Sequence, residues 1–139
     1  MKHIHMLFVS LLFLYSCDIE NPGTVLTANE LPGSVVTFIS EKKILGDEEI
    51  IAYYDTTIAL NNSESAILTN RNIIYYNSGR IDKISLSSIK SISEIENCFG
   101  VCILITSSDN KIMKIEIAPL NNGNLFLQLL EEQTNNYLL

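Results

Sequence analysis

The stretch Ala66-Ile67-Leu68-Thr69-Asn70-Arg71-Asn72-Ile73-Ile74-Tyr75-Tyr76 contains two apolar runs separated by a polar segment. Both runs are rich in isoleucine or tyrosine, residues that fit a pleated, half-buried strand. Asn77-Ser78-Gly79 follows and is a typical hairpin signal, because Asn and Gly tolerate the positive φ angles of a tight turn. The stretch therefore predicts antiparallel strands that follow one another directly along the chain.

Similar short strand patterns lie on both sides of this stretch. They cover residues 49–54, 57–60, 80–86, 89–96, 101–106 and 112–117. In the last of them Met113, Ile115 and Ile117 alternate with Lys114 and Glu116, as in a strand with one buried face. About seven short strands at this spacing predict a mainly β fold, an antiparallel barrel or sandwich.

The pattern becomes helical at the C-terminal end. After Asn122, four large apolar residues recur with helical spacing: Leu125, Phe126, Leu129 and Leu130. They predict an amphipathic helix packed on the strands. A short helix is also expected near the start of the domain, with Ser34 as N-cap and Gly46 as its end, and the β-branched run from Val35 to Thr37 leaves a strand as the alternative.

Many antiparallel strands closed by one C-terminal helix is the outline of the pleckstrin-homology (PH) superfold. Residues 66–76 resemble the L-T-(N/D)-x-R-(I/V)-I-Y-Y stretch of bacterial PH-like and GRAM-like domains, and residues 81–92 resemble the strand and turn that follow it there. The resemblance spans roughly residues 44–133 and implies a PH-like fold, with another small barrel or sandwich as the alternative. It also implies a docking or assembly module rather than an enzyme.

Phosphoinositide binding is not expected from this resemblance. PH domains that bind these lipids use basic residues near the first strand-to-strand loop, and residues 54–57 carry an acid and no base. The candidate binding surface is instead aromatic: of the neighbouring tyrosine pairs Tyr53-Tyr54 and Tyr75-Tyr76, one ring in each should be exposed, with Tyr54 and Tyr76 as the candidates.

The N-terminal segment has the pattern of an export signal. Lys2 precedes an apolar run over residues 6–15, which is too short to span a bilayer. Leu14-Tyr15-Ser16-Cys17 resembles the bacterial lipobox, and this resemblance implies cleavage before Cys17 and acylation of that cysteine. The alternative is an ordinary signal peptide with an incidental Cys. We expect residues 1–16 to be the signal, 17–30 a lipidated flexible tether and 31–139 the PH-like domain, on the envelope membrane of a bacterium.

Composition excludes several classes of function. His3 and His5 both lie in the expected signal, so the mature chain lacks the histidines on which common triads and metal sites depend. After loss of Lys2 it carries eight basic and sixteen acidic residues, a net charge near −8 that disfavours nucleic acid binding. No cofactor, metal or catalytic residue is predicted.

Two local clusters remain. Cys98 and Cys102 flank Phe99-Gly100-Val101, and they are expected either to form a disulfide across a hairpin or to stay reduced in the core. Asp47-Glu48-Glu49 lacks the alternating pattern of a calcium loop and is expected to be a solvated turn.

The sequence thus predicts a non-enzymatic, membrane-anchored lipoprotein that binds an unidentified envelope protein or peptide. The alternative is a structural or lipid-contacting module that acts through membrane proximity alone.

Overall fold

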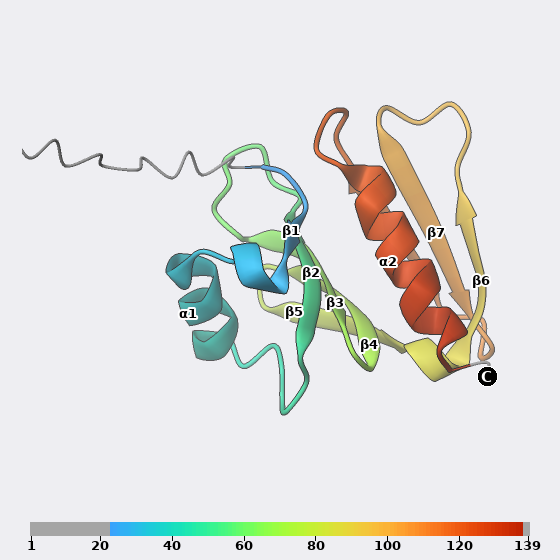
Figure 1. Cartoon of the computed structure of the whole chain (residues 1–139), viewed down its shortest axis with the longest axis horizontal. Coiled ribbons are helices and arrows are strands. Elements are labelled where there is room, and N and C mark those ends of the chain that lie inside the picture. The colour runs from blue at the N-terminus through green and yellow to red at the C-terminus, as the bar shows by residue number, and fades with distance from the viewer. Residues whose placement is uncertain (1–22, 138–139) are drawn as a thin grey trace, which may run out of the picture.

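The computed structural model describes residues 23–137, which form two antiparallel sheets and two α-helices (Figure 1). The first sheet contains, in pairing order, β1 (Leu26–Thr27), β2 (Ile50–Asp55), β3 (Glu64–Thr69), β4 (Asn72–Asn77) and β5 (Arg80–Ser85). The second sheet contains β6 (Ile89–Glu94), β7 (Val101–Ser107) and β8 (Ile112–Ile117). The helices are α1 (Gly33–Glu41) and α2 (Gly123–Asn135), with short 3-10 helices η1 (Ala28–Glu30) and η2 (Leu86–Ser88).

The prediction of a mainly β fold with a C-terminal amphipathic helix is confirmed. Two antiparallel sheets facing one core fit a β-sandwich. In β8 the alternation is as predicted, with Met113, Ile115 and Ile117 buried and the residues between them exposed. Phe126 and Leu130 of α2 are fully buried against both sheets. The hairpin turn is also confirmed, because Asn77 pairs with Arg80 around two residues of positive φ.

The first sheet is covered on both faces. Its inner face joins the second sheet and α2 in the larger core, through residues such as Leu68 and Ile73. Its outer face packs against Val35 and Ile39 of α1 in a second, smaller core. The short helix expected near Ser34 is therefore present, although its N-cap is Pro32, two residues earlier than predicted, and it ends at Glu41 rather than at Gly46.

The predicted strand over residues 57–60 is wrong. These residues belong to the β2–β3 connection, because the buried carboxylate of Asp55 binds the loop from inside. It accepts hydrogen bonds from the backbone N–H groups of Thr57 (2.8 Å) and Asn62 (2.7 Å) and from the Thr57 hydroxyl (2.6 Å). These bonds hold the backbone in a turn, and the segment therefore pairs with no strand.

The expectation of a flexible tether up to residue 30 is also corrected. Leu26 pairs with Tyr53 at the edge of the first sheet, and Val25 is buried. The backbone N–H of Val25 donates to the carbonyl oxygen of Asn121 at 2.9 Å. The folded part therefore begins near Thr24, because an apolar residue and a sheet edge capture the chain there. The predicted signal, Cys17 and the first part of the tether lie outside the described residues.

Within residues 23–137, no helix is both long and apolar enough to cross a membrane.

Candidate functional site

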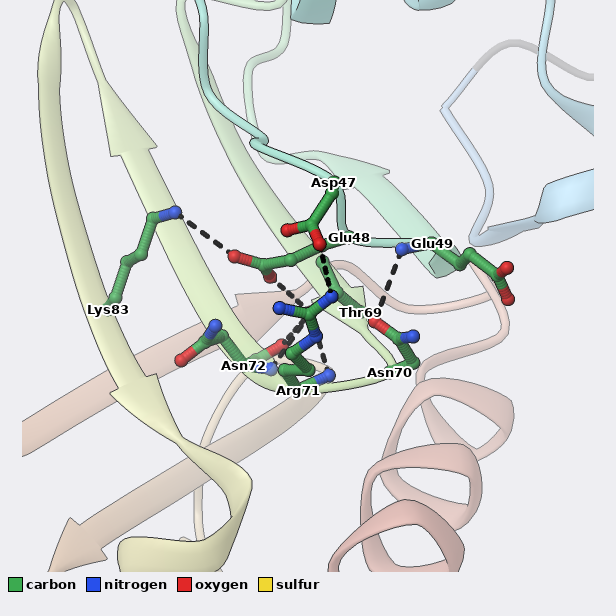
Figure 2. Close-up of polar contacts among 8 residues, drawn as sticks. All are labelled: Asp47, Glu48, Glu49, Thr69, Asn70, Arg71, Asn72 and Lys83. Carbon is green, nitrogen blue, oxygen red and sulfur yellow. Dashed lines mark hydrogen bonds and ion pairs between the residues drawn. The ribbon is translucent and has the colours of Figure 1, made fainter.

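A group of bonded polar side chains lies where the chain enters β2 (Figure 2). The acidic segment Asp47-Glu48-Glu49 lies against the β3–β4 turn, residues 69–72, and against Lys83 of β5. Arg71 donates to the carboxylate of Asp47 at 2.8 Å. The backbones also bond to each other, since Asn70 N–H donates to the carbonyl oxygen of Glu49 at 3.0 Å. The acidic segment is therefore bonded to the hairpin, while Asp47 and Glu49 stay exposed as expected for a solvated turn.

Thr69 is the centre of this group. Its side chain is fully buried, and its hydroxyl donates to the Glu48 carboxylate at 2.6 Å. The same oxygen accepts the backbone N–H groups of Arg71 (3.1 Å) and Asn72 (2.8 Å), which closes the turn. A threonine at this position thus joins the hairpin turn to the preceding acidic segment.

Two of the three carboxylates in the group, those of Asp47 and Glu48, are paired with cations. Burial raises the pKa of Glu48, but the Thr69 and Asn72 side chains and the Lys83 ammonium outweigh it, so the pKa lies below its ordinary value. The Lys83 nitrogen lies 3.4 Å from the Glu48 carboxylate, whose side chain is only 9% exposed. The hydrogen bond from Arg71 likewise lowers the pKa of Asp47. These acids are held in their charged form by fixed partners.

The chemistry of this group is structural. Each of the two ion-paired carboxylates is already bound to a cation, and Glu48 is also bound to a hydroxyl. Among residues 23–137 no group of three or more His, Cys, Asp or Glu side chains is arranged to hold a metal ion. The group joins three segments of the first sheet, and we assign it no catalytic role.

The predicted aromatic surface is wrong. Tyr54 and Tyr76 are 3% and 4% exposed, and they lie in different cores. The Tyr54 hydroxyl accepts hydrogen bonds from the backbone of Ala118 (3.1 Å) and the side chain of Asn121 (3.2 Å). Tyr76 packs edge-on against Phe38 of α1. Because both faces of the first sheet are covered, alternation along the strand does not bring either ring to the surface.

Cys98 and Cys102 are brought together as a pair. Cys98 lies in the β6–β7 connection and Cys102 on β7, with their Cα atoms 6.1 Å apart and their sulfur atoms in a disulfide. This Cα separation lies within the range that a disulfide requires. Gly100 has a φ of +100° and makes the bend between them, where the backbone approaches Ile117 and Pro119. The other predicted site, Cys17, lies outside the described residues.

Sequence reasoning missed the partners of the acidic segment. The ion pair between Glu48 and Lys83 joins residues 35 positions apart, and no local periodicity predicts it. The available signal was the Thr-Asn-Arg-Asn turn itself, whose short polar side chains commonly bond to nearby backbone groups.

Comparison of the chain with protein-family models, with curated proteins and with solved structures returned no significant match.

Proposed function

We propose that this protein is a lipid-anchored lipoprotein of a bacterial envelope, and that its PH-like domain binds an extended segment of another protein along the open edge of β6. The function is non-enzymatic. The anchor is supported by Leu14-Tyr15-Ser16-Cys17 and the apolar run before it. The PH-like fold is supported by five-stranded and three-stranded antiparallel sheets with a C-terminal helix, together with the resemblance of residues 66–76.

The observation that carries the binding proposal is the outer edge of β6. This strand pairs only with β7 and lies at the outside of its sheet (Figure 1). Its centre, Ser91-Ile92-Ser93, has no charge, and both serines are exposed. An edge strand with unpaired backbone groups is a template on which a second strand can add, and natural proteins usually protect such edges with charged side chains.

One hydrogen bond shows which backbone groups of β6 point away from β7. Ile95 N–H donates to the carbonyl oxygen of Cys102 at 2.8 Å, so this residue pair is of the hydrogen-bonded type. Hydrogen-bonded and non-hydrogen-bonded pairs alternate along antiparallel strands. Ser93 and Ser91 therefore bond to β7, whereas the backbone groups of Ile92 and Glu94 point away from it.

β6 has charged side chains only near its ends, at Lys90 and Glu94, whereas the other long edge strands carry charges at their centres. On β8, Lys114 and Glu116 form an ion pair on exposed side chains. On β5, Arg80 pairs with Asp82, and the Lys111 ammonium donates to the backbone carbonyl of Lys83 at 2.7 Å. The β1 edge is only two residues long. Among the described strands, β6 is the edge that best suits an added strand.

The anchor is tested by the intact mass of protein purified from its own membranes. We expect loss of residues 1–16 and a gain equal to the attached acyl chains, and we expect Cys17→Ala to retain its signal peptide. A mature protein without added lipid would contradict the anchor.

The binding edge is tested by photo-crosslinking in intact cells. A benzoylphenylalanine in place of Ser91 should form a discrete adduct with a second protein, and the same probe in place of Lys114 on β8 should not. Glu94→Pro removes an outward-facing N–H without breaking a bond to β7, so it should abolish the adduct. Glu94→Ala removes the same side chain but keeps the N–H, and should leave the adduct intact. Equal adducts in both variants would contradict strand addition.

A further inference from the structure

Three connections meet at one end of the domain. They are the β2–β3 connection (residues 56–63), the β6–β7 connection (95–100) and the β8–α2 connection (118–122). Figure 1 shows all three at the upper end of the molecule, and the described chain also begins there. The β3–β4 turn and the C-terminal end of α2 lie at the opposite end.

Contacts between the connections make this end one continuous surface. A Cβ added to Gly23 would lie 3.4 Å from the Leu60 side chain and 4.0 Å from the Asn121 amide nitrogen. A Cβ added to Gly100 would overlap the backbone around Ala118. Gly23 thus lies beside the β2–β3 and β8–α2 connections, and the β6–β7 connection packs against the β8–α2 connection.

The tips of these connections are apolar and exposed. Ile58, Phe99 and Leu120 have exposures of 105%, 86% and 100%, so each side chain projects into solvent. Single exposed apolar residues are common, but three large ones at the same end of one domain favour a binding surface there. Only one charged residue, Glu96, occurs in the three connections, although the chain as a whole carries a net charge of −7.

We propose that this end of the domain, with Ile58, Phe99 and Leu120 at its tips, inserts into the interfacial region of the lipid bilayer. The inference rests on the proposed anchor at Cys17. Gly23 lies six positions after Cys17, a span of at most about 20 Å when fully extended. The anchor therefore holds this end closer to the bilayer than any other part of the domain.

The chemistry of the surface fits a lipid interface. Burying a large apolar side chain favours partitioning by a factor on the order of ten or more. The asparagines of these connections supply uncharged polar groups for the headgroup level, and the near absence of charge avoids repulsion from anionic lipids. Because β6 leads directly into the β6–β7 connection, its open edge would begin next to the membrane surface.

The chain contains no tryptophan, so one introduced indole reports on one position. We would purify the full lipidated protein as Phe99→Trp and reconstitute it in phosphatidylcholine vesicles brominated in the acyl chains. Leu120→Trp is a second reporter at this end. The matched control is Ile112→Trp, because Ile112 is also apolar and 65% exposed but starts β8 at the opposite end from Ile117.

We expect at least twofold stronger quenching by brominated lipid at positions 99 and 120 than at position 112. Protein that floats with the vesicles but shows equal quenching at all three positions overturns the inference and leaves the anchor intact. Blue-shifted but unquenched emission at 99 and 120 shows that protein rather than lipid covers the loops, and also overturns the inference. Protein that does not float overturns the anchor and this inference together, whereas the β6 edge is tested separately by crosslinking.

Discussion

The hydroxyl of Thr69 donates a 2.6 Å hydrogen bond to the carboxylate of Glu48, across 21 residues of sequence. Because Thr69 is fully buried and also accepts two backbone N–H groups, one side chain joins the hairpin turn, the acidic segment and the entry to β2. The stability of the first sheet should depend on this bond more than on the exposed ion pair between Arg71 and Asp47.

Thr69→Val should lower the free energy of unfolding by about 1–3 kcal/mol, because it keeps the side-chain shape but leaves buried donors and the Glu48 carboxylate without their partner. Urea unfolding at neutral pH measures this change. Thr106→Val, at a half-buried site on β7, is the control and should change stability by less than about 0.5 kcal/mol. Equal effects of both substitutions would contradict the role of Thr69.

Glu48→Gln should reduce the loss of folding stability as the pH falls. The pKa of Glu48 is lowered in the folded protein, so its carboxylate stabilises the fold above its ordinary value of 4.5 and this contribution is lost as the pH falls below it. Urea unfolding from about pH 6 to about pH 3 should show a smaller loss of stability in Glu48→Gln than in the wild type. Glu131→Gln, on an exposed site of α2, should follow the wild-type curve.

Gly100→Ala should be far more destabilising than Gly79→Ala. Both glycines have φ near +100°, so alanine is strained at both, by about 1–2 kcal/mol. At Gly79 nothing lies within 4 Å of the added Cβ, whereas at Gly100 the Cβ would overlap the carbonyl oxygen of Ile117. We expect a loss above about 3 kcal/mol for Gly100→Ala in thermal or urea unfolding. Similar losses for both variants would show that the backbone at Gly100 can move.

Cys98 and Cys102 should be oxidised in protein isolated from the envelope. Alkylation of the denatured protein without reductant should then label neither residue, and reductant should expose two thiols. The loop that they close is short, so reduction should lower the free energy of unfolding by only about 2 kcal/mol. Two labelled thiols without reductant would show that the pair is reduced in the cell.

Some elements follow from the sequence because their cause is local. The alternation from Ile112 to Ile117 depends only on neighbouring residues, and so does the helical spacing of Phe126 and Leu130. The Ser78-Gly79 turn needs only two residues of positive φ. A local pattern of this kind determines the type of element wherever one face is buried.

Other features were decided by contacts between distant segments. Tyr53 and Tyr54 are both buried because α1 covers the second face of the sheet, and a two-residue period cannot predict a covering helix. Residues 57–60 have the composition of a strand, but the buried Asp55 carboxylate holds them in a turn.

The sequence by itself determined a mainly β chain with a C-terminal amphipathic helix, and it supplied the signal-like N-terminal segment and the cysteine spacing. Only the tertiary structure decided which surfaces stay open. The free edge of β6 and the position of the connections that carry Ile58, Phe99 and Leu120 at one end arise because packing brings together segments that lie tens of residues apart. Strand pairing and core packing act through space, so a pattern read along the chain predicts the elements but not which of their edges and loops become neighbours.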